Sequence, residues 1–291
     1  FTNKFASAIE YYQKHNYSEY PQQDVPVPDV LFEEQHTLDV GGLQIELIAV
    51  AGAETNDSLI VWLPQHKICF TGNLFGCPFG HFPNLVTIRG DRYRDALTVA
   101  TAVKTVMDLG AETIVYGHHA PIEGKALIES ELRVLHDAIL YVHDETVAGM
   151  NAGKDVHTLM EEITLPPELE VGQGYGKVSW SVRAIWEHYA GWFHHQSTTE
   201  LYSVPQKSIN PDLLELAGGA NALVERAEAK HTDAEFEQAL HLLDIVLFEE
   251  PEHRGAVSLS LEIHQSLALQ SENFWLSSWL ENEQEVLRTR L

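Results

Sequence analysis

The chain has 291 residues, of which 44% are hydrophobic and 9% aromatic, a composition that excludes a disordered protein. Its 43 acidic and 18 basic residues give a formal charge of −25, which repels phosphate backbones and anionic membrane surfaces. We therefore expect no nucleic-acid partner. Because no run of about eighteen apolar residues occurs, we also expect no membrane span.

The two cysteines, Cys69 and Cys77, make no disulfide framework and indicate no compartment. Cys69 lies in an apolar run and is expected to be a buried packing residue. The chain opens without Met in the segment FTNKFASAIEYYQ, which reads as helix and has its apolar helical spacing at Lys4–Gln13, so we expect this N-terminus to be a cut within a domain.

Strands follow a proline-containing extended loop at Asn16–Val30. Gly41-Gly42 predicts a hairpin between the first two strands, and Pro64-Gln65-His66 predicts another between the next two. The predicted strands are Gln35–Val40, Leu43–Val50, Leu59–Leu63, Lys67–Phe70 and Thr113–Tyr116. With the helices around them, they predict a layered α/β structure over the first 120 or so residues.

Helical periodicity dominates the rest of the chain. The predicted helices are Asp91–Leu109, Ile122–Asn151, Asp155–Ile163, Val178–Phe193, Pro211–Lys230, Asp233–Phe248, Glu252–Leu269 and Asn273–Arg288. A glycine-rich loop at Val171–Gly176 interrupts the series. Past Pro205 the pattern is loosely tetratricopeptide-like, which favours a helical packing or dimerisation module. We therefore predict three domains, at residues 1–125, 126–204 and 205–291.

Polar residues that could bind a metal follow three of the strand ends. Glu54 follows Ala-Gly-Ala, Asn73 follows Phe-Thr-Gly, and His118 follows Tyr-Gly. Taken singly, a loop Glu is more often a surface charge, an Asn after Gly a turn residue and a His structural. Their shared context at strand ends is what makes them candidates for one site.

These motifs, AGAETNDSLIVWLPQHKICFTGN and VYGHH, resemble the second half of a metallo-β-lactamase fold. Within that superfamily, the chain resembles zinc-dependent alkylsulfatases of the SDS-hydrolase type over nearly its whole length. The specific stretches are NLVTIRG at Asn84–Gly90, GYGKVSWSVRAIWEHYAGWF at Gly174–Phe193 and LAGGANALVERAEA at Leu216–Ala229. The implied fold is the C-terminal half of an αββα sandwich in residues 1–125. A helical extension with a substrate-pocket loop and an all-helical dimerisation module follow.

The resemblance implies a role for each matching residue. Glu54 and His118 would be zinc ligands, and Asn73 would take the bridging position of a site that holds two zinc ions. Arg89 would bind the sulfate, because a guanidinium fork fits a tetrahedral oxyanion. Asn84 and Tyr175 would donate hydrogen bonds to the same group. From the residues alone, the structural interpretations are favoured: Arg89 would form a surface ion pair, and Tyr175 would pack on Trp180.

The chain departs from the family pattern at the metal site and beside Asn84. None of the sixteen histidines forms a His-x-His-x-Asp-His motif, which would belong before Phe1. The bridging carboxylate is replaced by the neutral amide of Asn73, a weaker ligand. Next to Asn84, the family has His where this chain has Pro83. His81, which is close but not aligned, takes its place as a catalytic candidate, and Arg89 is the other catalytic candidate.

Three hypotheses follow. In the first, a second polypeptide or further segment supplies the missing half, and the protein hydrolyses alkyl sulfates to alcohol and inorganic sulfate with a zinc-activated water. In the second, it is a divergent member with one metal or another anionic ester as substrate. In the third, it is a degenerate, non-catalytic homodimer that acts as a binding or scaffold protein. The family implies a periplasmic or secreted protein, and a cytoplasmic location stays open.

Overall fold

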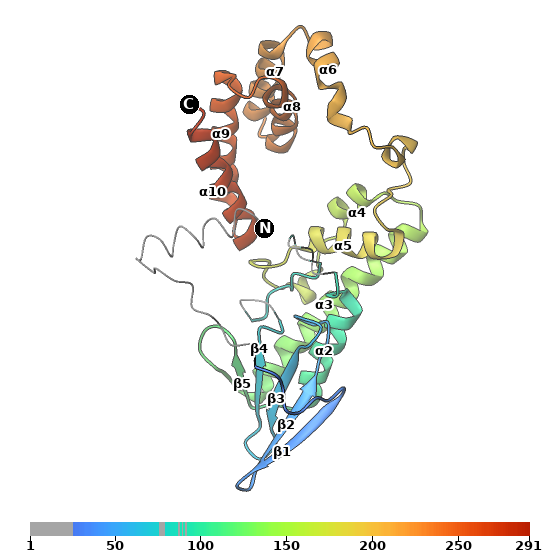
Figure 1. The fold of residues 1–291 in the computed structure, drawn as a ribbon, viewed down its shortest axis with the longest axis vertical. Coiled ribbons are helices and arrows are strands. Elements are labelled where there is room, and N and C mark those ends of the chain that lie inside the picture. Colours follow the sequence, from blue (N-terminus) through green and yellow to red (C-terminus); the bar gives the residue numbers. More distant parts are fainter. Residues whose placement is uncertain (1–25, 76–78, 87, 89, 91) are drawn as a thin grey trace. The chain divides into compact units, whose positions relative to one another are not determined.

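The computed structural model describes residues 26–75, 79–86, 88, 90 and 92–291 (Figure 1). The chain divides into two compact units, Phe1–Glu34 and Gln35–Leu291. The described residues of the first unit, 26–34, form neither helix nor strand. The predicted helix Lys4–Gln13 and Cys77 lie outside the described residues.

The second unit begins with a sheet whose described strands lie in the order β1-β2-β3-β4-β5-β6. The strands are β1 (Gln35–Val40), β2 (Leu43–Ala49), β3 (Leu59–Leu63), β4 (Ile68–Gly72), β5 (Thr113–Tyr116) and β6 (Ile122–Glu123). All neighbours pair antiparallel except β4 and β5, which are parallel. The predicted strands are confirmed to within two residues, but β6 was missed. Ile122 and Glu123 pair with β5 instead of opening the next helix.

The α/β part and its extension hold four described helices. Helix α2 (Ala96–Asp108) lies between β4 and β5 in the chain, and α3 (Lys125–Asn151), α4 (Val156–Glu162) and α5 (Val178–Ala190) follow β6. The predicted start of α2 at Asp91 is wrong. Asp95 accepts a hydrogen bond from the backbone N–H of Thr98 at 3.0 Å, and it caps the helix there. The predicted end of α5 at Phe193 is also wrong, since that helix stops before Gly191.

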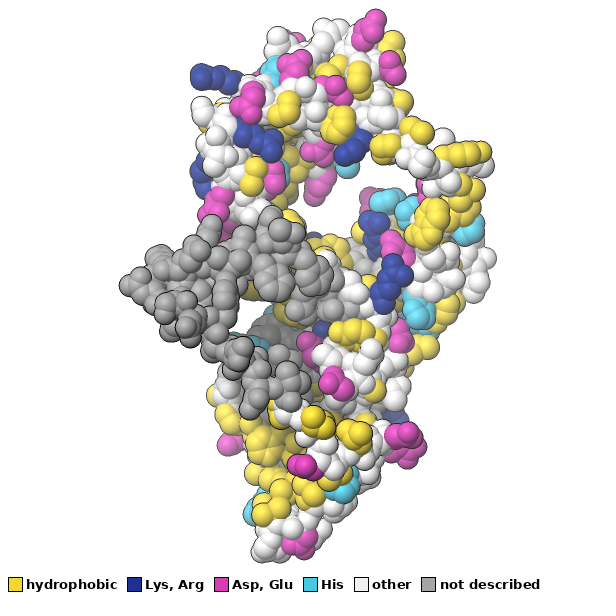
Figure 2. Space-filling model, viewed as in Figure 1, with side chains coloured by type: hydrophobic (Ala, Val, Ile, Leu, Met, Phe, Trp, Pro, Cys, Tyr) yellow, Lys and Arg dark blue, Asp and Glu magenta, His cyan; other side chains and the backbone are white. Residues whose placement is uncertain are grey.

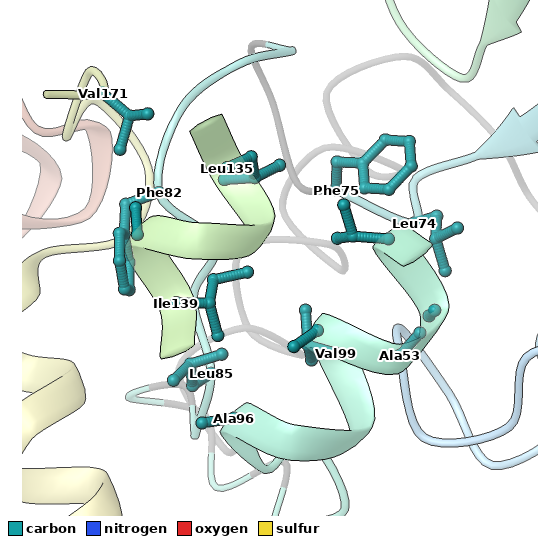
Figure 3. Close-up of a cluster of buried hydrophobic side chains, with 14 of the residues drawn as sticks. Ala53, Leu74, Phe75, Phe82, Leu85, Ala96, Val99, Leu135, Ile139 and Val171 are labelled. Atoms are coloured by element: carbon teal, nitrogen blue, oxygen red, sulfur yellow. The ribbon is translucent and has the colours of Figure 1, made fainter. Parts of the chain in front are cut away.

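One face of the sheet carries the main hydrophobic core. Alternate residues of the central strands, including Ile60 and Ile114, are fully buried in one cluster with residues of α2 and α3. Figure 3 shows side chains of both helices in one cluster with Leu74, Phe75, Phe82 and Leu85. Each such buried aliphatic side chain stabilises the fold by about 1.5–3 kcal/mol. On the opposite face, Leu59 and Phe70 remain 41% and 39% exposed.

The C-terminal part of the chain is helical, as predicted, and has its own core around Leu243 and Ile263. Its helices are α6 (Asn210–Ala217), α7 (Ala220–Thr232), α8 (Phe236–Glu249), α9 (Arg254–Gln270) and α10 (Phe274–Arg288). Short 3-10 helices at Pro167–Leu169, Thr198–Leu201 and Gln206–Ile209 precede it. The single helix predicted for Pro211–Lys230 is wrong. Gly218 and Gly219 take φ angles of 90° and 104°, which end α6 and turn the chain into α7.

Candidate functional site

The parallel pairing of β4 and β5 brings Asn73 and His118 to the same edge of the sheet. Gly72 lies opposite Tyr116, and the N–H of Gly117 donates to the carbonyl of Gly72 at 2.9 Å. A Cβ atom at Gly117 would lie 2.1 Å from Asn73 Oδ1, so only glycine fits beside this amide. Both Asn73 and His118 are exposed.

Glu54 lies in the loop after β2, and its carboxylate is bound by an arginine. Arg94 Nη1 donates to Glu54 Oε2 at 2.6 Å. The Arg94 side chain is fully buried, whereas that of Glu54 is 24% exposed. Nε and Nη2 of Arg94 have no hydrogen-bond partner among the described residues. Arg94 therefore depends on Glu54 for its neutralisation.

The three predicted zinc ligands therefore do not form a metal centre by themselves. The described part of the chain holds no group of three or more His, Cys, Asp or Glu side chains that could bind a metal ion. The Glu54 carboxylate is hydrogen-bonded to Arg94, and Asn73 has a neutral amide, which is a weak metal ligand. The donors on the described part of the chain do not fit a metal ion without further ligands, and the metal roles of Glu54, Asn73 and His118 stay predictions.

His81 lies against the glycine-rich loop formed by residues 171–176. The N–H of Phe82 donates to the carbonyl of Gly172 at 2.7 Å, and the N–H of Gly176 donates to that of Phe82 at 3.1 Å. The backbone N–H of Gly174 donates to His81 Nδ1 at 3.1 Å. Burial lowers the pKa of His81. Since Nδ1 is an acceptor here, the neutral ring carries its proton on Nε2 and presents a donor there.

Two of the three predicted sulfate-binding residues, Asn84 and Tyr175, lie on the two segments that these hydrogen bonds join. Asn84 is 3% exposed, and its Nδ2 has no partner among the described residues. Tyr175 is half-buried on the glycine-rich loop, and Gly176 next to it approaches Pro83 too closely for any side chain. Arg89 lies outside the described residues. A buried amide donor without a partner is costly unless a ligand satisfies it.

Two residues of this region were missed by sequence reasoning. Arg94 falls within the predicted helix Asp91–Leu109 and was given no role, and its burial has no signature in the local sequence. Asn273 donates from Nδ2 to the carbonyls of Gln173 and Tyr175 at 2.7 and 3.1 Å. The chain offers only an indirect signal for it, the Ser-Glu-Asn stretch before a predicted helix, which indicates a cap.

Comparison with known proteins shows which proteins the chain is similar to. Residues 155–289 match the family described as Alkyl sulfatase dimerisation. A linear primary-alkylsulfatase of Pseudomonas sp. (strain ATCC 19151) is 26% identical over 257 residues, which are 87% of this chain and 48% of the relative. An (R)-specific secondary-alkylsulfatase of Pseudomonas sp. is 26% identical over 271 residues, 89% of this chain and 40% of the relative.

The fold is also found in a solved structure. The stereoselective inverting sec-alkylsulfatase Pisa1 from Pseudomonas sp. superposes with a TM-score of 0.81 at 24% identity, over 91% of this chain and 43% of Pisa1. The expected α/β part followed by an all-helical dimerisation module is thereby confirmed. The chain spans less than half the length of the curated relatives it matches. None of the described helices is long and apolar enough to cross a membrane.

Proposed function

We propose that this chain, a homologue of the alkylsulfatases that carries their dimerisation domain at residues 155–289, forms part of a sulfuric ester hydrolase. The substrate class is the alkyl sulfate ester, which is hydrolysed to an alcohol and inorganic sulfate. Because the chain covers 40–48% of these relatives, the activity belongs to the proposal for the whole protein.

One geometric observation supports this substrate class most directly. The segment that carries Asn84 and the loop that carries Tyr175 are about ninety residues apart in sequence, yet main-chain hydrogen bonds between Phe82, Gly172 and Gly176 join them. The two predicted sulfate donors therefore belong to one local structure. An orphaned amide donor on Asn84 suits an anionic oxygen, which gives stronger hydrogen bonds than a neutral acceptor.

Each residue of the site has a defined part in binding. Asn84 Nδ2 and the Tyr175 hydroxyl donate to sulfate oxygens, and Arg89 supplies a local positive charge in a protein of formal charge −25. His81 is held neutral by burial and by its bond from Gly174, so its Nε2–H donates to the ester or to the departing oxygen. Together these groups orient the ester and stabilise negative charge on it.

Dependence on zinc is a separate part of the proposal, beyond the hydrolysis of sulfate esters. The resemblance of the sequence to zinc-dependent alkylsulfatases supports it, but the donors described on this chain do not make a centre alone. Residues of a second polypeptide or of a further segment would have to complete the ligand set around Glu54 and His118. We derive no reaction step through a metal ion. Metal analysis of the purified protein, with two, one or no zinc per protomer, separates the three hypotheses stated from the sequence.

The helical module is proposed to make a homodimer. The dimerisation family covers it, and large hydrophobic side chains remain exposed on its helices. Leu216, Leu269 and Trp279 are 84%, 90% and 61% exposed. Figure 2 shows hydrophobic side chains on this part of the surface, interspersed with acidic ones. Single exposed apolar residues are normal on protein surfaces, so the match to the dimerisation family is what supports the homodimer.

A second function is favoured by the Glu54–Arg94 pair. If this carboxylate serves only to neutralise a buried arginine, and an amide stands at position 73, the protein binds anionic esters without cleaving them. In that case it would be a non-catalytic dimeric binding protein. Binding without turnover is its distinguishing property.

Release of inorganic sulfate from octyl sulfate tests the two functions. The full chain, prepared with every polypeptide that co-purifies with it, is assayed with and without added Zn²⁺, with octyl phosphate as the control ester. We expect protein-dependent sulfate release that Arg89→Ala abolishes. Absence of release in all conditions would refute the hydrolase and leave the binding protein.

A further inference from the structure

The glycine-rich loop at residues 171–176 is held from two sides, and the second side belongs to the last helix of the chain. On the first side, the loop contacts segment 81–83, as described above. On the second side, Asn273 Nδ2 donates to the carbonyls of Gln173 and Tyr175, and the N–H of Phe274 donates to the carbonyl of Gly174 at 2.8 Å. Three successive loop carbonyls are thus bound by two residues at the start of α10.

Asn273 does two things at once, and only an amide side chain can do both. Its Oδ1 accepts from the N–H groups of Trp275 and Leu276, at 3.1 Å each, and so caps α10. Its Nδ2 donates both of its hydrogens to the loop. Asn273 is only 5% exposed, so these bonds are shielded from water. A Ser or Asp at this position would keep the cap and lose the two donors.

Trp275 adds a ring contact to the same loop. Its ring lies 5.8 Å from the ring of Tyr175, centroid to centroid, at an angle of 58°. Tilted aromatic pairs at this separation restrict each other's orientation. The Tyr175 ring is therefore oriented by α10, while its backbone is fixed by Asn273.

We propose that Asn273 and Trp275 are positioning residues for Tyr175, so that the first turn of α10 forms part of the alkyl sulfate site. This inference rests on the proposed function, because it gives the helical module a role in substrate binding beyond dimerisation. Tyr175 contacts the sulfate both before and during reaction. Loosening it therefore raises KM more than it lowers kcat.

The test compares Asn273→Ser with a matched substitution in the same module. Ser can still cap α10, but it lacks the amide that donates hydrogen bonds to the carbonyls of Gln173 and Tyr175. Asn221→Ser is the control, because Asn221 is exposed on α7 and contacts His253 rather than the loop. A second pair, Trp275→Phe and Trp275→Ala, separates retention of an aromatic ring from its loss.

Two readouts are measured on the full chain. For Asn273→Ser we expect amide hydrogen exchange in the peptide spanning residues 171–177 to quicken about ten-fold, and KM for octyl sulfate to rise about ten-fold with kcat changed less than three-fold. Trp275→Ala should raise KM similarly, and Trp275→Phe should restore most of the affinity. Asn221→Ser should alter neither readout.

The possible results distinguish failure of the positioning role from failure of the proposed function. Unchanged exchange in the loop of Asn273→Ser overturns the positioning role. Faster exchange with unchanged KM also overturns it, while alkyl sulfate hydrolysis stands. If the unmodified protein releases no sulfate, the proposed function fails, and binding of octyl sulfate by calorimetry takes the place of KM. Equal affinities of Asn273→Ser and the unmodified protein would then overturn the inference.

Discussion

Loss of the Glu54 carboxylate should destabilise the fold more than loss of the Arg94 guanidinium, because the two side chains of this ion pair are buried to different degrees. The guanidinium is fully buried, and the carboxylate is 24% exposed. Glu54→Gln leaves a buried cation without a counter-charge, which costs about 3–5 kcal/mol of unfolding free energy. Arg94→Met leaves a carboxylate that water can still reach. We expect that change to cost less, about 1–2 kcal/mol.

The double variant gives the sharper prediction. Glu54→Gln with Arg94→Met removes both charges and fills most of the arginine volume, so it should be about 1–3 kcal/mol more stable than Glu54→Gln alone. Urea unfolding followed by circular dichroism measures the differences, with the midpoints compared at constant slope. Lys104→Met is the control. Its pair with Asp108 is 55% and 59% exposed and should contribute less than about 0.5 kcal/mol.

Two results would refute this reasoning. If Glu54→Gln cost no more than Lys104→Met, Arg94 would not need the carboxylate. If the costs of the two single substitutions simply added in the double variant, the two side chains would not act as a pair.

Three further predictions concern single residues of the sheet and the site. Burial raises the pKa of Cys69 to about 12, so iodoacetamide should label this thiol only after unfolding in guanidinium chloride, and mass analysis showing native labelling would contradict its burial. Gly117→Ala places a Cβ against Asn73 Oδ1 and should lower the unfolding free energy by about 1–3 kcal/mol in calorimetry, with partial recovery when Asn73→Gly is added. The pKa of His81 is lowered by burial below 6.5, so the unfolded state binds more protons as the pH falls. The stability that His81 contributes should be present above pH 6.5 and be lost below it, and urea midpoints that show the same pH dependence in His81→Gln would contradict this.

Local patterns were enough to predict the strands and most helices. Gln35–Val40 and Leu59–Leu63 match β1 and β3 to the residue, because glycine and proline turns bound short apolar or alternating runs. The single helix expected at Pro211–Lys230 failed because the apolar period continues through Gly218-Gly219, while the backbone there turns. Periodicity reports which face is apolar and does not register a change of direction.

Contacts between residues far apart in the sequence could not be predicted from local patterns. Arg94 and Glu54 are 40 residues apart, and Asn273 and Gln173 are 100 apart. Nothing near Arg94 in sequence marks it as buried, and its partner Glu54 lies in the loop after β2. The nearness of Asn73 and His118 was expected because both follow strands of one sheet. The metal roles of these two residues and the sulfate role of Arg89 remain predictions from the family resemblance.

The central claim is that Asn84 and Tyr175 form one alkyl sulfate site. Titration calorimetry of the full chain with monomeric octyl sulfate tests it directly, in the unmodified protein and in Asn84→Ala and Tyr175→Phe. We predict saturable binding that each substitution weakens about ten-fold or more, because each removes a hydrogen bond to a charged group. No saturable binding, or equal affinity in all three proteins, would contradict the account.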